Sequence, residues 1–345
     1  MKSFAPFALT ALLLGCASPP TASQAGPAPC DRVCLGAIGE QFVASIAAKD
    51  PSRVQRTRTY AATENGVASA LEMMTIWRTA TGAQKSHFII DTPSQQVFVI
   101  AAIGEGSGDA LLFGRLKAEG RLVSEIEFYT NRSRGDGGFA FDAKGLAQLP
   151  APWTDVIAPA RLPTRARLQE LGRGIFDMSI AGPPDSVSCD IVENGQIVGE
   201  DPEILLALAP PEAVKGRNMT PRADGTVTVP CGTPPERPTD PKARVIVDEQ
   251  SGIALGLATI DGATQPYLVT KPTLSAFVPF AILAPYAKKL REQEASGKYT
   301  APALRSMPAT ATVAHVIRVY DGKLQAMHLL VHLGPPGSHS PWTGK

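Results

Sequence analysis

The sequence predicts an α+β protein made of two tandem copies of one domain, each with helices packed on a curved antiparallel sheet. Three matches that occur in the same order in both parts of the chain carry this prediction. They are Glu-Asn-Gly at 64–66 and 193–195, KSHFIID at 85–91 and KARVIVD at 242–248, and EGRL at 119–122 and DGKL at 321–324. Chance produces single matches easily but ordered triples rarely.

The first copy is expected to begin with a helix and to continue as a meander of strands. Apolar residues recur at helical spacing from Ile38 to Ile46, and Asp50-Pro51 ends the helix. Asn-Gly at 65–66 is a turn signal. Alternating or β-branched runs then predict strands at 86–91, 95–103, 110–117 and 121–129.

The second copy follows the same order with extra sequence. Leu168, Leu171, Ile175 and Phe176 have helical spacing, and Gly182-Pro183 ends that helix. The matched motifs lie further apart than in the first copy. Insertions are therefore expected at about 197–241 and 262–312.

The N-terminus is typical of a secreted protein. An apolar run ends at Leu-Leu-Gly-Cys, which resembles a bacterial lipobox. This resemblance implies removal of residues 1–15 and lipidation of Cys16 on the periplasmic side of the envelope, in the outer membrane because Ala17 follows. An ordinary signal peptide is the alternative. The expected layout is a tether at 16–29, a first domain at 30–150, a linker at 151–163, a second domain at 164–333 and a tail at 334–345.

Four cysteines remain after Cys16, an even number for an oxidising compartment. Four cysteines allow three pairings, and proximity favours Cys30–Cys34 and Cys189–Cys231. They lack the paired spacing of a zinc site, so no metal is expected. The formal net charge of +1 gives no electrostatic footprint for nucleic acid.

Three stretches resemble the nuclear-transport-factor-2-like superfamily, also called SnoaL-like. They are CDRVCLGAIGEQFVASIAAKDPSRV from residue 30, the TENG that follows, and RLKAEGRLVSEIE; SVSCDIVENG in the second copy resembles the second domain of a bacterial and fungal branch. The resemblance implies two cone-shaped domains, each with an apolar pocket between helices and sheet. The superfamily contains isomerases, dehydratases, epoxide hydrolases, lyases and non-catalytic binding proteins, so the fold does not give the activity.

The last hairpin of the second copy supplies the main catalytic hypothesis. If Asp321-Gly322 is a two-residue turn, counting outwards pairs His315 with His328 on an apolar face, which His332 continues. Two neighbouring histidines can transfer a proton near neutral pH and titrate as a unit. Two core histidines are the alternative, and a one-residue slip in register would separate them.

Other candidates come mainly from the first copy. His87 is a further candidate base, and Asp91 shares its strand face. Trp77 is a candidate pocket wall, with core packing as the alternative. The remaining candidate substrate-binding residues are Arg115, Phe113 and His332.

Several glutamates are expected to have structural roles. Glu125 and Glu127 alternate with apolar residues and are expected to face outward near Arg115 or Lys117. Glu64 and its counterpart Glu193 are expected to cap backbone N–H groups beside the Asn-Gly turns, with a general base as the alternative.

The sequence favours a cofactor-independent acid–base enzyme, a lyase, dehydratase or isomerase, acting on an apolar or aromatic small molecule. No phosphate-binding Gly-Lys-Ser/Thr loop, HExxH or GxSxG motif is present. A non-catalytic envelope lipoprotein that binds a hydrophobic ligand or a protein partner is the alternative, and self-association is left open.

Overall fold

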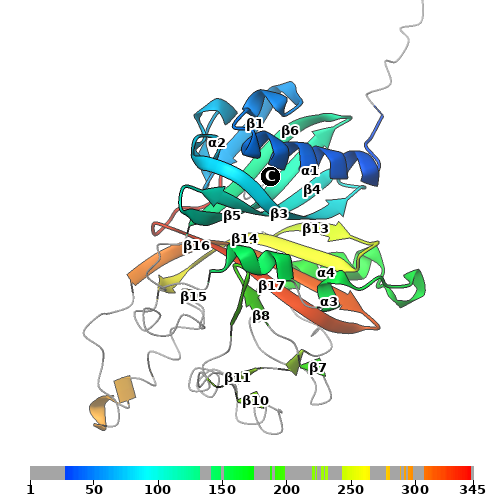
Figure 1. Cartoon of the computed structure of the whole chain (residues 1–345). Coiled ribbons are helices and arrows are strands. Elements are labelled where there is room, and N and C mark those ends of the chain that lie inside the picture. Colours follow the sequence, from blue (N-terminus) through cyan, green and yellow to red (C-terminus); the bar gives the residue numbers. More distant parts are fainter. Residues whose placement is uncertain are drawn as a thin grey trace, which may run out of the picture.

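The protein has mixed α+β structure, with two large sheets and few helices (Figure 1). No helix among the residues that the structure describes, given next, is long and apolar enough to cross a bilayer. The structure is a computed structural model, and it describes residues 28–132, 141–148, 151–174, 187–188, 191–198, 220–221, 223, 227–228, 230–231, 243–264, 277–279, 288, 291–292, 294–297 and 307–342.

Sheet 1 comes from the N-terminal part of the chain. Its strand order is β2-β1-β6-β5-β4-β3, and all neighbours are antiparallel except β1 and β6. The strands are β1 (Arg56–Glu64), β2 (Val67–Ala68), β3 (Ala80–Asp91), β4 (Gln96–Glu105), β5 (Gly108–Glu119) and β6 (Leu122–Arg132). The helices around it are α1 (Arg32–Ala47), η1 (Pro51–Arg53), η2 (Leu71–Met73) and α2 (Thr75–Thr79). The four predicted strands of the first copy are confirmed as β3 to β6.

Sheet 2 comes from the C-terminal part of the chain. Its order is β13-β14-β16-β17-β8-β9, with β15 added on β14, and β17 and β8 are parallel. The strands are β8 (Ile191–Glu193), β9 (Gln196–Val198), β13 (Arg244–Asp248), β14 (Ile253–Thr264), β15 (Phe277–Pro279), β16 (Met307–Tyr320) and β17 (Lys323–Gly334). β14 and β16 thus extend into the stretch predicted as an insertion at 262–312.

The remaining elements connect the sheets or lie beside sheet 2. They are η3 (Ala143–Gln148), α3 (Ala151–Thr154), η4 (Pro159–Arg161), α4 (Arg165–Gly174), the strand pair β7 (Val187–Ser188) and β12 (Pro230–Cys231), and the pair β10 (Thr220–Pro221) and β11 (Val227–Thr228).

Sheet 2 repeats the strand order of sheet 1. Each Glu-Asn-Gly stretch is a tight turn between the first two strands of its sheet, and each asparagine has positive φ, 52° at Asn65 and 47° at Asn194. KSHFIID ends the edge strand β3, and KARVIVD forms the edge strand β13. The first two repeated motifs therefore occupy equal places in the two sheets. The third is displaced by one residue, because Glu119 of EGRL pairs with Leu122, whereas Tyr320, which precedes DGKL, pairs with Lys323.

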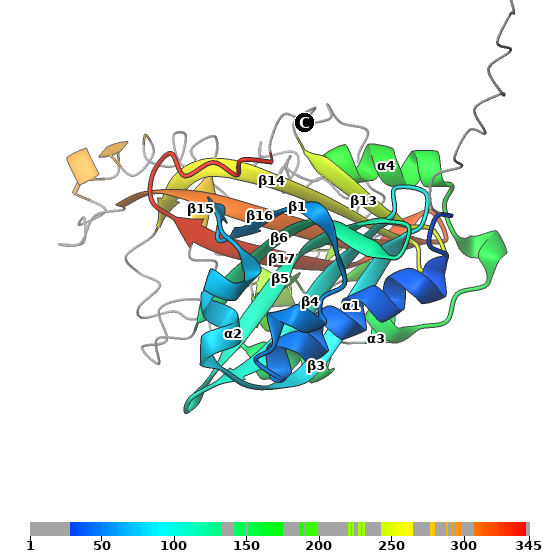
Figure 2. The same cartoon turned by 90° about the horizontal axis from the view of Figure 1, so that it is seen from above.

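Helix α1 covers one face of sheet 1 (Figure 2). Asp31 caps the helix by accepting a hydrogen bond from the backbone N–H of Cys34, 2.8 Å away. Its buried apolar side chains then pack on the sheet, as the periodicity predicts. Helix α4 packs on sheet 2 through Leu168 and Leu171, while Ile175 and Phe176 of the predicted helix lie outside the described residues.

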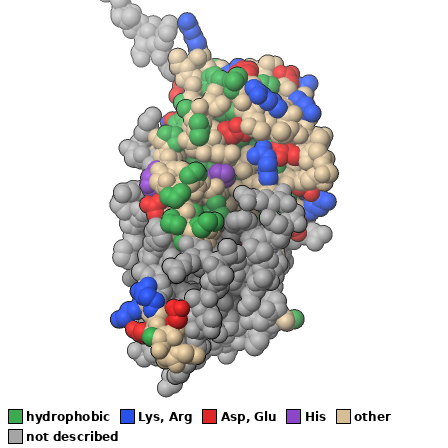
Figure 3. Space-filling view, turned by 90° about the vertical axis from the view of Figure 1, so that its left-hand side faces the viewer, with side chains coloured by type: hydrophobic (Ala, Val, Ile, Leu, Met, Phe, Trp, Pro, Cys, Tyr) green, Lys and Arg blue, Asp and Glu red, His purple; other side chains and the backbone are tan. Residues whose placement is uncertain are grey.

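The other face of sheet 1 packs against sheet 2. Along β6, Ile126 and Phe128 belong to the core under α1, whereas Tyr129 belongs to a second core between the sheets. That second core also contains Val316 and Leu330 of sheet 2. The alternation of side chains along each strand therefore gives sheet 1 two buried faces. On the outer surface seen in Figure 3, Lys and Arg side chains are interspersed with Asp and Glu over the upper part.

Candidate functional site

The hairpin between β16 and β17 turns where the sequence predicts, but its register then changes. Asp321 and Gly322 both have positive φ, and Tyr320 pairs with Lys323. A bulge beside Arg318 then shifts the pairing by one residue. Every side chain beyond the bulge consequently faces a different partner from the one that simple counting predicts.

This shift separates the two candidate histidines, so the predicted His315–His328 pairing is wrong. His315 pairs with Leu329, and His328 pairs with Val316. Val316 belongs to the core between the sheets, so His328 faces sheet 1. His315 lies on the opposite face of sheet 2, because directly paired residues share a face and neighbours alternate.

His328 is held in the core between the sheets as a neutral hydrogen-bond acceptor. The backbone N–H of Gly195 donates to its Nε2 atom over 3.3 Å, and the Trp153 ring meets its ring edge-on at 6.2 Å. Burial, followed by the nearby His87, lowers the pKa of His328 to about 3. Such a weakly basic imidazole is a poor match for a general base at neutral pH.

His87 and His332 also face the core between the sheets. His87 Nε2 lies 2.8 Å from the carbonyl oxygen of Leu146 and donates to it, and burial lowers the pKa of His87. His332 Nδ1 lies 3.0 Å from Asn131 Oδ1, and its ring contacts Tyr129. Burial, followed by the charge of Arg132, lowers the pKa of His332 to about 4. Both rings join sheet 1 to later parts of the chain.

Trp77 lies on the α1 side of sheet 1, in the core. Its ring makes edge contacts with Phe42 and Phe128, and its indole N–H donates to Ser45 Oγ over 3.2 Å. Only 3% of Trp77 is exposed. Phe113, by contrast, packs in the core between the sheets. These predicted binding residues therefore lie on opposite faces of sheet 1 and do not line one pocket.

Arg115 belongs to a buried ionic cluster centred on Glu127, which is fully buried. Glu127 accepts hydrogen bonds from Arg115 Nε at 2.9 Å, Arg244 Nη2 at 2.7 Å, the Tyr129 hydroxyl at 2.9 Å and the Ser340 hydroxyl at 2.9 Å. Burial and the Glu127 charge raise the pKa of Tyr129. Glu127 points away from the α1 core beside Arg115, as predicted, but sheet 2 and the C-terminal segment bury it.

The C-terminal segment closes this cluster. The Trp342 ring lies over the Arg115 guanidinium, 4.8 Å from ring centroid to Cζ. Its indole N–H donates to Thr63 Oγ1 over 2.8 Å. The sequence predicts only a tail at 334–345, and no local pattern there indicates that Ser340 and Trp342 are buried.

Asp91 was predicted to bind substrate, but it makes a buried contact between the two sheets. It is fully buried and pairs with Arg165 at the start of α4, with 2.8 Å between Arg165 Nη2 and Asp91 Oδ1. Its Oδ2 also accepts the backbone N–H of Val247 in β13 over 3.1 Å. Asp91 thus binds both a helix and an edge strand of the other sheet.

The same contact occurs a second time with the roles of the sheets exchanged. Asp248, the counterpart of Asp91, is fully buried and binds both terminal nitrogens of Arg32 at 2.7 and 2.8 Å. Its Oδ2 accepts the backbone N–H of Ile90 in β3 over 3.2 Å. Asp91 and Asp248 occupy matched positions in the repeated motifs, and that match was the only sequence signal for this reciprocal contact.

Glu64 has a capping role, as the sequence predicts, but it caps helix α2, eleven residues along the chain, rather than N–H groups beside the Asn-Gly turn. Its carboxylate accepts the backbone N–H groups of Thr75 at 2.8 Å and Ile76 at 3.2 Å. Replacing Glu64 with alanine is expected to lower the free energy of unfolding by about 1 kcal/mol, because these N–H groups lose their acceptor. Urea denaturation measures the loss. Glu64→Gln keeps an acceptor and should lose clearly less; equal losses would contradict the capping role.

The side of sheet 2 that faces away from sheet 1 carries two ionisable side chains, an imidazole and a carboxyl group. His315 pairs with Leu329 of β17, and Leu329 pairs with Glu193 of β8, so the three residues share one face and one level. The Cα atoms of His315 and Glu193 are two strand spacings apart, about 10 Å. Both residues are buried, at 6% and 1% exposure. We take His315 and Glu193, with the apolar side chains around Leu329, as the candidate site.

Hydrogen bonds at the turns define the true equivalence between the sheets. The backbone N–H of Asn65 donates to the carbonyl of Phe128, and that of Asn194 donates to the carbonyl of Leu329. Phe128 therefore corresponds to Leu329. Its partner Gly114 corresponds to His315, whereas the match of EGRL at 119–122 with DGKL at 321–324 would place Phe113 there.

Gly114 leaves no room for a side chain. A Cβ atom there would lie 2.4 Å from the Cα atom of Phe128. At this position sheet 1 has a glycine packed against Phe128, whereas sheet 2 has the imidazole of His315 beside Leu329. The candidate site is a property of sheet 2 alone.

The disulfide Cys30–Cys34 is confirmed. For the second predicted disulfide, β12 pairs the backbone of Cys231 with Val187, two residues before Cys189, and Cys189 lies outside the described residues. The predicted signal peptide, Cys16 and most of the predicted tether also lie outside the described residues.

No protein-family model matches the chain, and no curated protein matches its sequence. The candidate site is therefore defined by its own geometry: His315 and Glu193 on one buried face of sheet 2, separated by Leu329.

Proposed function

We propose that the protein is a lipid-anchored envelope protein that binds a small, mainly apolar molecule on the face of sheet 2 that carries His315 and Glu193. We further propose that it acts there as a cofactor-independent lyase, dehydratase or isomerase. The observation that supports this proposal is the placement of an imidazole and a carboxylate at one level of a buried, otherwise apolar face.

The proposed proton transfer depends on the residues that surround His315 and Glu193. Val313 and Val331 flank the level of His315 and Leu329 and belong to an apolar cluster on this face. Small-molecule sites combine such apolar walls with a few polar groups that orient the ligand. In this proposal His315 removes a proton from the bound molecule, and Glu193 is a second proton-transfer group on the other side of Leu329.

The proposal also treats both parts of the chain as copies of one cone-shaped domain, as the resemblance to the nuclear-transport-factor-2-like superfamily implies. Support comes from the shared strand order, the two Asn-Gly turns and the matched aspartates. In the first copy, Trp77, Phe42 and Phe128 fill the space under α1. Ligand binding is therefore assigned to the second copy.

The test is turnover and binding on aromatic and terpenoid alcohols and ketones. We expect His315→Gln to lower turnover by about a hundredfold or more, because a positioned general base contributes on that order. Glu193→Gln should also lower turnover, and ligand-observed NMR should still detect binding in both variants. His339→Gln is the matched control, since that side chain is 53% exposed. Full turnover in both His315→Gln and Glu193→Gln would refute the catalytic proposal.

A non-catalytic binding protein is the second candidate function. The observation that favours it is the role of Glu64, which corresponds to Glu193 in the other Asn-Gly turn. Glu64 caps helix α2, which is a structural role. If Glu193 has the same structural role, the face can bind a ligand without turning it over. Ligand binding by the unmodified protein without turnover of any bound compound would support this candidate.

Lipid anchoring is proposed from the sequence Leu-Leu-Gly-Cys at 13–16. Cys16→Ala is expected to move the protein from the detergent phase to the aqueous phase in Triton X-114 partitioning, because the acylated thiol is lost. Intact-mass analysis should show acyl chains on the unmodified protein only. Detergent-phase partitioning of Cys16→Ala would exclude Cys16 as the anchor.

A further inference from the structure

We propose that the Cys30–Cys34 disulfide is a redox site whose state controls the contact between Arg32 and Asp248. Arg32 lies within the five-residue loop that the disulfide closes. Asp248 belongs to the edge strand of sheet 2. A change at two neighbouring cysteines can therefore reach the contact between the two sheets.

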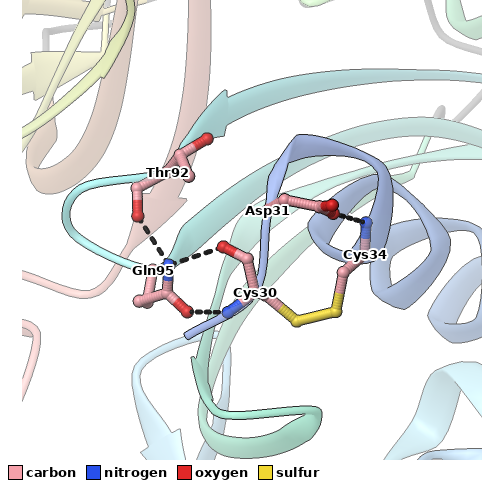
Figure 4. Close-up of a disulfide and its surroundings, with 5 residues drawn as sticks. All are labelled: Cys30, Asp31, Cys34, Thr92 and Gln95. Carbon is pink, nitrogen blue, oxygen red and sulfur yellow. Dashed lines mark hydrogen bonds between the residues drawn. A yellow bond between two sulfur atoms is a disulfide. The ribbon is translucent and has the colours of Figure 1, made fainter. Parts of the chain in front are cut away.

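The disulfide fixes the point where the chain enters helix α1 (Figure 4). Cys34 is in the first turn, where its N–H donates to the cap residue Asp31. Cys30 is tied to the turn after β3, because its N–H donates to Gln95 Oε1 over 2.7 Å and its carbonyl accepts from Gln95 Nε2 over 2.8 Å. The bridge thus joins a helix start to a residue that is already anchored on sheet 1.

Arg32 is oriented by this arrangement. It is the first residue of α1, and its guanidinium binds both carboxylate oxygens of Asp248. A two-point contact of this kind needs a fixed backbone, because the fork of the guanidinium must match the plane of the carboxylate. Opening the disulfide returns conformational freedom to the loop that carries Arg32.

Cys34 is the sulfur that a reductant can reach. Cys34 is partly exposed, whereas Cys30 is 4% exposed. The reductant is a protein dithiol. One thiolate attacks Cys34 Sγ and forms a mixed disulfide, while Cys30 leaves as a thiolate and takes up a proton. The second thiol of the reductant then releases Cys34, so the dithiol is oxidised to a disulfide and two cysteine thiols form.

The Arg165–Asp91 contact is an internal control for the effect of reduction on the Arg32–Asp248 contact. The contact between Arg165 and Asp91 has the same layout, with an arginine at a helix start and a buried aspartate at the end of an edge strand, although Arg165 binds Asp91 through Nη2 alone and pairs with Glu249 through Nη1. Pro163 and Thr164 precede Arg165, and no cysteine lies near it in the sequence. Reduction should therefore loosen one contact and leave the other unchanged.

Two backbone amides report on the two contacts separately. The N–H of Ile90 donates to Asp248, and the N–H of Val247 donates to Asp91. The experiment measures hydrogen exchange at both amides by NMR in the full-length chain in detergent, with and without dithiothreitol. The variant Cys30→Ser/Cys34→Ser mimics the reduced state without a reductant. Cys189→Ser/Cys231→Ser, treated in the same way, shows any effect of the other two cysteines.

We expect reduction to speed exchange at Ile90 by about tenfold, while exchange at Val247 changes by less than about twofold, because only one local opening becomes easier. The Cys30→Ser/Cys34→Ser variant should show the same difference without a reductant, and the Cys189→Ser/Cys231→Ser protein should respond to dithiothreitol like the unmodified one. Unchanged exchange at Ile90, or equal acceleration at both amides, would overturn the proposal.

Discussion

Replacing Asp248 with alanine is expected to lower the free energy of unfolding by about 2–3 kcal/mol, because the buried carboxylate is lost as an acceptor for a backbone N–H and for Arg32, whose side chain is 32% exposed. The side chain of Asp248 is 1% exposed, and it binds Arg32 and the N–H groups of Ile90 and Ser251. Alanine leaves the Ile90 N–H without this acceptor, whereas the Ser251 N–H keeps the backbone carbonyl of residue 248. Equilibrium urea denaturation followed by circular dichroism measures the change.

Asp91→Ala should cost a similar amount, since Asp91 makes the reciprocal contacts with Arg165, Val247 and Ser94. Glu170→Ala is the control. Its carboxylate also pairs with an arginine, but its side chain is 51% exposed, so a loss below about 1 kcal/mol is expected. A loss of that small size in both aspartate variants would show that the two contacts do not hold the sheets together.

Acidification from pH 6.5 to pH 5 is expected to destabilise the protein by about 3 kcal/mol through His328 and His332 together. Their pKa values are lowered to about 3 and about 4, from an ordinary value of 6.5. Below pH 6.5 the unfolded chain binds protons on both rings, whereas the folded protein keeps them neutral. Stability from these two groups is thus complete above pH 6.5 and falls as the pH decreases towards 4 and 3.

The measurement is the slope of unfolding free energy against pH between 5 and 6.5. His328→Gln should reduce the part of that slope that comes from the buried histidines by about a third to a half, because His332 and His87, whose pKa values are also lowered, still titrate while an acceptor for Gly195 remains. His332→Gln should act similarly, and His339→Gln, at an exposed histidine, should leave the slope unchanged. Identical slopes in all variants would contradict the assignment.

The elements of the fold were predictable from local patterns. Strands β3 to β6, helix α1 and both Asn-Gly turns follow from alternation, helical spacing and turn residues, which act over short stretches of chain. The register of the last hairpin was not predictable, because the bulge beside Arg318 leaves no mark in the sequence around Asp321-Gly322. That single residue moved His315 and His328 to opposite faces.

The candidate site was predictable only in part, because the packing of one sheet on the other decides it. Glu127 looked solvent-facing from its alternation with apolar residues, and residues far along the chain, Arg244 and Ser340, bury it. His315 was predicted from the sequence as a candidate catalytic residue with His328 as its neighbour. In the structure the polar residue at the same level of that face is Glu193, on the other side of Leu329. Such neighbours follow from long-range pairing, which no local pattern encodes.

The mutual cover of the edge strands β3 and β13 has a consequence for how the protein reaches its folded state. A chain synthesised from its N-terminus completes sheet 1 at Arg132, but β13 begins only at Arg244. Until then, β3 presents an open strand edge beside an uncovered apolar face, the combination that promotes aggregation. The first sheet is thus open to strand pairing with other chains until the C-terminal part of the chain is made and covers the edge of β3.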